Sequence, residues 1–192
     1  VSDELHFPNL SMVGVDDRAA AHTAVAHLIA QGHSKIAVLG GPTTSFPSRM
    51  RRLGAQDAME QAGLTFDDRL YGLSNYDFES AYHAMNSLLA RRAEFTALFA
   101  MSDVIAFGAI RALVSAGFRV PQDVSVIGFD GITMSRYCVP VMTTIVQPSE
   151  QIALQSIELL INQIEHGAPA QTITLQPELQ QGESVCPCRH PL

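Results

Sequence analysis

The stretch VPQDVSVIGFDG, residues 120–131, opens with a proline-containing turn, continues as an apolar run and stops at Asp130-Gly131. A short apolar run bounded by turn residues is typical of a strand that is buried on both faces. We therefore predict a strand over VSVIGF. The carboxylate and glycine that end it have two readings. Asp130 either belongs to a turn or faces a ligand at the strand's end.

The same pattern recurs along the chain, in which short apolar runs alternate with segments of helical periodicity. Three of these segments stop at a glycine, at Gly32, Gly63 and Gly117. Alternating strands and helices predict an α/β fold class, with a parallel sheet covered by helices on both faces. The predicted strands are LSMVGV, KIAVLGG, RLYGLS, FTALFAM, VSVIGF, TTIVQ and TITLQ.

Composition excludes several classes of protein. The 192 residues carry a net charge of −7, which repels phosphate backbones, so the chain by itself should not bind nucleic acid. No apolar run has the length of a membrane span. Three cysteines without framework spacing indicate a reducing compartment, here the cytoplasm. We expect no cofactor and no metal site, because Cys186, Cys188 and His190 form an incomplete ligand set.

Polar residues follow the predicted strands where each strand ends. The carboxyl ends of parallel strands meet at one edge of a sheet, so these side chains should line a common crevice. Donors, acceptors, a cation and an aromatic ring suit a polyhydroxylated or heterocyclic small molecule. The candidates are Asp16, Asp17, Ser45, Ser48, Arg49, Arg51, Asn75, Tyr76, Ser102, Asp103, Asp130 and Gln147.

Structural readings compete with these functional ones. Ser48 and Asp103 stand where helices begin, and we expect them to be N-caps. Tyr76 is either a core residue or part of a rim. Among the arginines of the second helix, only one can point back to the crevice, and the position of Arg51 favours it.

Several blocks in a fixed order resemble the lactose/galactose-repressor (LacI/GalR) family of bacterial transcription regulators. The first is DDRAAAHTAVAHLIAQGHSKIAVLGGP, and the later ones are RRLGAQDAM, ALFAMSDVIAFGAIRAL, GFRVPQDVSVIGFDG and VPVMTTIVQPSEQIALQSIELL. The resemblance extends from about Val13 to Leu175. It implies a type I periplasmic-binding-protein-like fold with a doubly wound parallel sheet. It also implies effector binding between two lobes of a homodimeric regulator.

The resemblance further implies a division of the chain. Residues 1–15 would be a remnant of the N-terminal lobe and its crossover strand. Residues 16–147 would form the C-terminal lobe, residues 148–176 the returning helix and strand of the N-terminal lobe, and residues 177–192 the C-terminal tail. The end of that tail, GESVCPCRHPL, is polar and contains prolines, and we expect it to be loose. We expect a piece of a longer regulator whose DNA-binding head lies outside this chain. Part of the usual cover should then be missing from Ile152, Leu154, Ile157, Leu160 and Ile161.

Matching the family's motifs residue by residue implies an effector site and a dimer contact. The effector contacts fall on Arg51, Tyr76, Ser102, Asp130, Gln147, Ser45 and Pro47. Ser102 is shorter than the family's usual Asn, and Gly131 stands where the family often has Asp or Asn. The dimer contact falls on Ile132, Met134, Tyr137 and Val139, for which core packing is the alternative.

The resulting hypothesis is a non-catalytic sensor of a sugar, sugar phosphate or nucleoside-like effector, which reaches operator DNA only through a head outside this chain. A periplasmic-type sugar-binding protein of the same fold is the first alternative. An enzyme on a doubly wound sheet is the second. It would need a nucleophile or an acid–base pair, which Asp130 beside Arg51 does not supply.

Overall fold

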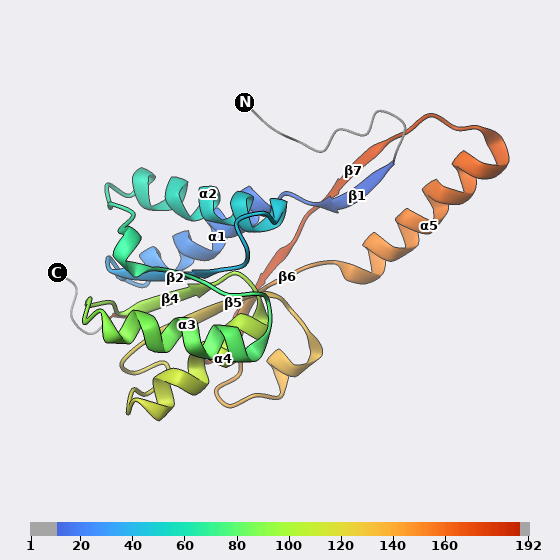
Figure 1. Cartoon of the computed structure of the whole chain (residues 1–192). Coiled ribbons are helices and arrows are strands. Elements are labelled where there is room, and N and C mark those ends of the chain that lie inside the picture. Colours follow the sequence, from blue (N-terminus) through green and yellow to red (C-terminus); the bar gives the residue numbers. More distant parts are fainter. Residues whose placement is uncertain (1–10, 189–192) are drawn as a thin grey trace. The chain divides into compact units, whose positions relative to one another are not determined.

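The computed structural model describes residues 11–188 and forms two compact units (Figure 1). Unit 1 comprises Val1–Asp16 and Gln147–Pro177, and unit 2 comprises Asp17–Val146 and Glu178–Leu192. Most of the expected 1–15 segment lies outside the described residues. The domain boundaries implied by the family resemblance stay a prediction.

Unit 2 is built on a six-stranded sheet of order β3-β2-β4-β5-β6-β8. The first five strands of that order are parallel to their neighbours, and β8 runs antiparallel to β6. The predicted α/β class with a doubly wound parallel sheet is confirmed. The strand order reverses between β2 and β4, the place where open α/β sheets bind ligands. The strands are β2 (Ile36–Gly40), β3 (Tyr71–Leu73), β4 (Ala97–Ala100), β5 (Ser125–Asp130), β6 (Thr143–Val146) and β8 (Glu178–Gln180).

Helices cover both faces of this sheet. In Figure 1, α1 and α2 lie on one side and α3 and α4 on the other. Two 3-10 turns, η1 (Asp68–Leu70) and η2 (Thr133–Arg136), lie in the connections. The helices are α1 (Asp17–Ala30), α2 (Phe46–Gln61), α3 (Phe78–Ala90) and α4 (Asp103–Ser115).

Short polar side chains start three of these helices, but not all are the predicted ones. Ser45 accepts from the Ser48 amide, and Ser102 accepts from the Ile105 amide. Asp77 caps α3 in the same way. The expectation that Ser48 and Asp103 are the caps was therefore wrong. The residue that caps lies outside the helix, in extended conformation, and helices α2 and α4 begin earlier than periodicity indicated.

Small residues bring α1 and α2 close together. Ala20, Ala21 and Ala24 of α1 are buried. A Cβ built on Gly54 of α2 would lie 2.0 Å from the carbonyl oxygen of Arg18 in α1. The two helix backbones are thus almost in contact, which only glycine permits at position 54.

The tail that we expected to be loose is part of unit 2. The Ser184 hydroxyl donates to the Val126 carbonyl (2.6 Å) and accepts from the Thr143 amide (2.8 Å). The Cys188 amide donates to the Gln31 carbonyl (2.8 Å). Polar composition suggested solvent exposure, but here a small hydroxyl satisfies backbone groups that would otherwise be buried without partners.

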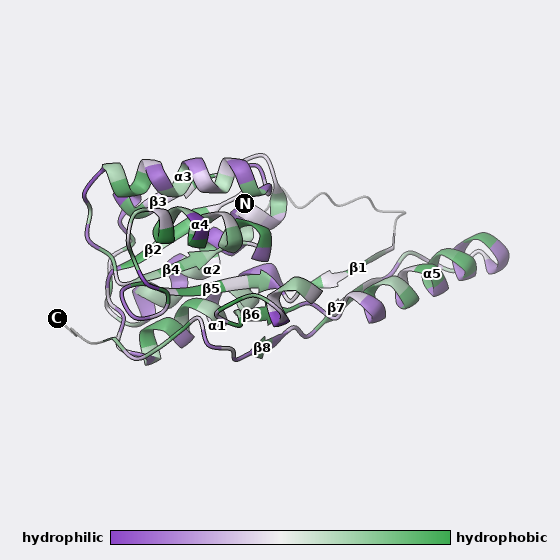
Figure 2. Cartoon of the chain, turned by 90° about the horizontal axis from the view of Figure 1, so that it is seen from below, coloured by the Kyte–Doolittle hydropathy of each residue, from purple (hydrophilic) through white to green (hydrophobic). Residues whose placement is uncertain are grey.

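Unit 1 contains a two-stranded parallel sheet and one helix. Strand β1 (Met12–Val15) pairs with β7 (Thr172–Leu175), and α5 spans Ser149–His166. Gly167 ends this helix in the left-handed conformation (φ 60°). Figure 2 shows hydrophobic residues along α5. The expected lack of cover is confirmed for Leu154, Ile157, Leu160 and Ile161, which are exposed, whereas Ile152 is half-buried.

Among residues 11–188, no helix combines the length and the apolar character needed to cross a membrane.

Candidate effector site at the carboxyl edge of the sheet

A buried arginine lies at the carboxyl ends of the central strands. Arg51, in the second turn of α2, is only 6% exposed. Its Nε donates to Asp17 Oδ1 (2.7 Å), and its Nη1 donates to the Met101 carbonyl (2.5 Å). Nη1 also lies 3.6 Å from Asp130 Oδ1, and the guanidinium stands 3.6 Å above the centre of the Phe129 ring. Four contacts, from α1, from β5 and from the end of β4, therefore fix this cation in one orientation.

Arg51, Asp130 and Asp17 were all predicted to line the crevice, but the contacts of Arg51 with Asp17, Phe129 and Met101 were not predicted. Asp17 is the first residue of α1 and lies 34 positions before Arg51 in the chain. Phe129 reads as one more apolar residue of β5, and Met101 contributes only its carbonyl. No local pattern marks Phe129 or Met101 as a partner of Arg51, because the contacts form only when the helices pack on the sheet.

The Asp130-Gly131 turn has an unusual backbone. Both residues have positive φ, 110° at Asp130 and 70° at Gly131. A Cβ at Gly131 would also come within 2.7 Å of a Val146 methyl group. Glycine is therefore required at 131 by both the dihedral angle and the lack of space. Asp130 ends β5 just before the bend at Gly131 and faces Arg51, and its contact with a ligand stays a prediction.

Three other candidates lie in the starts of helices. Ser45 and Ser102 accept the amides of Ser48 and Ile105 with their hydroxyl oxygens. Pro47 lies in the first turn of α2. These residues stand after β2 and β4, on either side of the point where the strand order reverses. Each of the three helps to begin a helix, and an additional contact with an effector stays a prediction for them.

Tyr76 follows β3 and packs against the chain after β2. A Cβ at Gly41 would fall 2.0 Å from the Tyr76 ring, and one at Gly40 would fall 2.8 Å from the Tyr71 hydroxyl. The glycine pair thus makes room for two tyrosines. Tyr76 has a φ of 60°. Its hydroxyl oxygen is buried and has no hydrogen-bond partner among the described residues.

The remaining predicted residues lie elsewhere. Gln147 follows β6 and belongs to unit 1, where its carbonyl accepts from the Ser149 amide (2.8 Å). In the segment around η2, Met134, Tyr137 and Val139 are 59%, 78% and 94% exposed. Core packing was therefore the wrong alternative for these three. Ile132 is half-buried.

A second carboxylate lies behind the turn. Asp103 is fully buried, and burial raises its pKa from 3.8 to about 6. The Thr144 hydroxyl and the Ile132 amide donate to this carboxylate and lower the pKa, whereas nearby Asp130 raises it. Burial dominates because an ionised carboxylate loses more hydration than these bonds restore.

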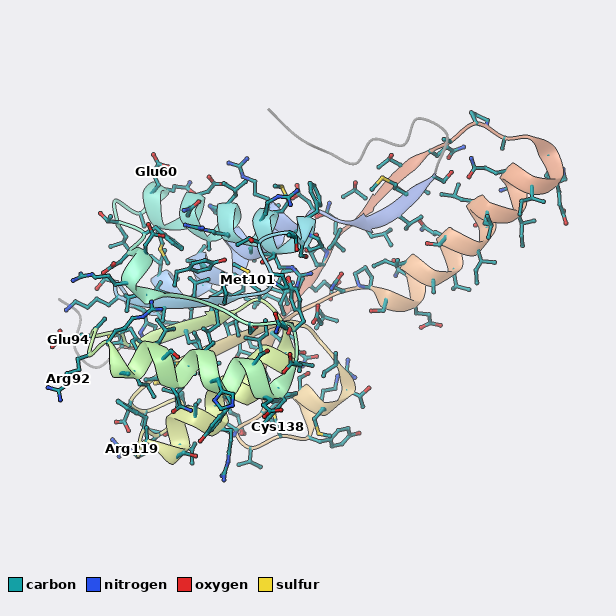
Figure 3. The ribbon with its side chains drawn as sticks, viewed as in Figure 1. Glu60, Arg92, Glu94, Met101, Arg119 and Cys138 are labelled. Carbon is teal, nitrogen blue, oxygen red and sulfur yellow. The ribbon has the colours of Figure 1, made fainter. Side chains whose placement is uncertain are left out.

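Two hollows lie at the opposite edge of the sheet. One, of about 250 Å³, is lined by residues that include His33, Arg119 and Cys186. The other, of about 800 Å³, is lined by residues that include Arg92 and Glu94. Figure 3 labels Met101 at the carboxyl edge and Arg92, Glu94 and Arg119 at the other end.

These hollows do not resemble a binding site. Their charged groups largely pair with one another, as Arg119–Asp123, Lys35–Glu94 and Arg69–Asp67 do. Within residues 11–188 there is no group of three or more His, Cys, Asp or Glu side chains arranged to hold a metal ion. His190 of the Cys186/Cys188 set lies outside the described residues. We therefore place the candidate site at the carboxyl edge.

Comparison with known proteins identifies the family. Residues 25–185 match the profile of the periplasmic binding protein-like domain. The transcriptional regulator MalR of Clostridium butyricum is 36% identical over 174 residues, which cover 91% of this chain and 52% of that protein. The transcriptional repressor PurR of Haemophilus influenzae is 38% identical over 161 residues, 83% of this chain and 48% of that protein.

A solved structure agrees with these relatives. The complex of the transcriptional regulator CelR with cellobiose superimposes with a TM-score of 0.88 at 31% identity, covering 92% of this chain and 54% of that one. The chain spans about half the length of the curated relatives it matches. The chain belongs to the periplasmic binding protein-like domain family and corresponds to the effector-binding region of LacI-family transcription regulators.

Proposed function

We propose that this chain senses a small hydroxylated effector on behalf of a cytoplasmic transcription regulator, without catalysing a reaction. The effector would be a sugar, a sugar phosphate or a nucleoside-like molecule. One observation carries the proposal: a buried donor, Arg51, and an acceptor, Asp130, lie 3.6 Å apart at the carboxyl edge of the sheet, beside the point where the strand order reverses. That point of the sheet is where this class of fold binds ligands.

The chemistry of this pair suits a hydroxyl group. A hydroxyl both donates and accepts, so it can accept from the guanidinium of Arg51 while it donates to the carboxylate of Asp130. Such charge-assisted bonds contribute about 1.5–3 kcal/mol each. Asp17 and Phe129 hold the guanidinium in place before the effector arrives, which lowers the entropy lost on binding.

Tyr76 supplies the aromatic part of the proposed site. Its ring would cover an apolar face of the effector, and its buried hydroxyl, unpartnered among the described residues, would gain a bond. Ser45, Pro47, Ser102 and Gln147 would complete the contacts. Because Ser102 also caps α4, its effector contact would come from the hydroxyl proton.

A sensor fits better than the alternatives. Arg51 and Asp130 are an ion pair and not an acid–base pair. The relatives MalR and PurR are named as a regulator and a repressor, which favours a regulator over a periplasmic-type sugar-binding protein. The structure of CelR contains cellobiose, a hydroxylated ligand of the kind proposed here.

Assembly and DNA contact complete the proposal. The exposed Met134, Tyr137 and Val139, with Ile132, would form the contact between two copies in a homodimer. With a net charge of −7, residues 1–192 are unsuited to phosphate backbones, so operator DNA would be contacted by other parts of the regulator. Residues 16–147 would act as the C-terminal lobe, and residues 148–176 would belong to the other lobe.

A thermal-shift screen of the full-length regulator tests the proposal. The panel holds sugars, sugar phosphates and nucleosides, with cellobiose first, and we expect at least one class to raise the melting temperature. Asp130→Ala should then abolish induction of a reporter while operator binding persists. Asp123→Ala, a change of the same type at the opposite edge, is the control and should induce normally. Induction by Asp130→Ala at the wild-type effector concentration would remove Asp130 from the site.

A further inference from the structure

Asp103 is a fully buried carboxylate whose position at the start of α4 does not explain it. The N-cap of that helix is Ser102, whose hydroxyl oxygen accepts the Ile105 amide at 3.1 Å. Burial of a carboxylate is unfavourable unless its oxygens accept hydrogen bonds that the protein needs. The partners of Asp103 therefore indicate its role.

The two oxygens of Asp103 bind groups that come from β6 and from the turn after β5. Oδ1 accepts from the Thr144 hydroxyl (2.6 Å), and Oδ2 accepts from the Ile132 amide (2.9 Å). The Gly131 amide also stabilises the ionised carboxylate. A Cβ at Gly128 would lie 2.2 Å from Oδ1, so β5 carries a glycine where Asp103 packs against it. Strand β5 thus leaves room for the Asp103 side chain at Gly128, and β6 supplies a hydrogen bond to it from Thr144.

The turn that Asp103 binds carries Asp130. Positive φ at an aspartate is rarely adopted without support from the surroundings. Asp130 and Gly131 both have positive φ. The amides of Gly131 and Ile132 donate to the Asp103 carboxylate and hold the chain in this conformation. If these bonds were lost, the turn would relax and the carboxylate of Asp130 would leave its place 3.6 Å from Arg51.

We propose that Asp103 is a positioning residue of the effector site, which holds the 130–132 turn so that Asp130 faces Arg51 and the effector. The positioning of the turn rests on geometry alone, and its consequence for the effector rests on the function proposed above. The family resemblance assigned no role to Asp103.

A pH dependence follows from the surroundings of Asp103. The titratable groups that face it are Asp130 at the end of β5 and the Cys138 thiol, whose pKa is raised by burial and by the charge of Asp103. The pKa of Asp103 itself is raised to about 6. Below that pH the carboxyl is neutral, and its bond to the Ile132 amide loses the assistance of charge. The hold on the turn should therefore weaken as the pH falls through about 6.

Amide hydrogen exchange of the full-length protein, followed by NMR, tests the positioning. Asp103→Asn keeps an oxygen for the Ile132 amide and a donor for Thr144, whereas Asp103→Ala keeps neither. At pH 7 we expect Ile132 protection to fall at least about tenfold in Asp103→Ala and to stay within about threefold of wild type in Asp103→Asn. The control amide is Val126, which donates to the Ser184 carbonyl. It should keep its protection in both variants.

A pH series separates positioning from general stability. After correction for intrinsic exchange, wild-type Ile132 protection should fall as the pH is lowered through about 6, by no more than about threefold and toward the level of Asp103→Asn, which should show no such step. Unchanged Ile132 exchange in Asp103→Ala would overturn the proposal. An equal loss of protection at Val126 would overturn it too, because a merely structural role predicts that result.

Calorimetric titration with cellobiose then separates this inference from the proposed function. If wild type binds and Asp130→Ala does not, Asp103→Ala should bind at least about tenfold more weakly, with recovery in Asp103→Asn. Wild-type affinity in Asp103→Ala would refute the positioning role and leave the proposed function standing. If wild type does not bind cellobiose, that sugar is removed from the proposed function, and the exchange data alone decide the role of Asp103.

Discussion

The two units of this chain use the same sequence pattern and reach different degrees of burial. In unit 2, the apolar faces of α1 to α4 and the strands between them form one buried core. In unit 1, α5 buries Leu159, while several of its other apolar side chains stay exposed among the described residues. An amphipathic pattern shows which face of a helix is apolar and suited to packing against other parts of a protein. Whether the cover is present depends on residues far away in the chain.

The largest expected effect comes from a matched pair of leucines. Leu113 of α4 is 0% exposed and Leu160 of α5 is 56% exposed. Leu113→Ala should lower the free energy of unfolding by about 2–5 kcal/mol, because it leaves a cavity in a closed core. Leu160→Ala should change it by less than about 1 kcal/mol. Urea denaturation of both variants measures the difference.

Equal destabilisation by the two substitutions would show that α5 is covered in solution, and the contrast between the units would then fail.

A buried charge in the covered unit gives the second effect. Because the pKa of Asp103 is raised from 3.8 to about 6, the folded state binds this proton more tightly than the unfolded state. Its contribution to stability therefore falls as the pH rises from 4 to 6, by up to about 3 kcal/mol. Asp103→Asn does not titrate, so the stability of wild type minus that of the variant should fall over this range.

Chemical denaturation of both proteins at several pH values between 4 and 7 measures that difference. A constant difference would mean that Asp103 titrates near its ordinary pKa and is not desolvated as the structure indicates.

The smallest effect comes from two glycines, one in each unit. Gly54→Ala places a Cβ against the backbone of α1 and should destabilise by about 1–3 kcal/mol. Gly14→Ala meets no atom within 4 Å and should be neutral within about 0.5 kcal/mol. Thermal unfolding compares them directly. Tolerance of Ala at 54 would mean that α1 and α2 are not in close contact.

Hydrophobic periodicity and the glycines that end the helices were enough to predict the alternation of strands and helices. Both signals depend only on neighbours in the sequence. The missed elements depend on distant partners. Strand β8 forms because Glu178–Gln180 finds the free edge of β6, and the tail is ordered by Ser184 between β5 and β6. Neither pairing leaves a local signal in a short polar segment.

The candidate site divides in the same way. Residues at strand ends could be found because the parallel fold gathers them at one edge, and Arg51 and Asp130 were found by that rule. Asp17 and Asp103 were also candidates by that rule, but Asp103 was expected to be a cap, because a short carboxylate at a helix start usually caps. Their true partners, Arg51 and the turn at Ile132, are 34 and 29 positions away. Packing alone brings them together.

Backbone chemical-shift mapping of the full-length regulator tests the central claim most directly. The protein is titrated with the compound that stabilises it most in the thermal-shift panel, beginning with cellobiose. We predict the largest shifts at the carboxyl edge, at the amides of Met101, Ser102, Asp130 and Gly131. Shifts confined to His33, Arg119 and Cys186, which line the hollow at the opposite edge, would contradict this prediction.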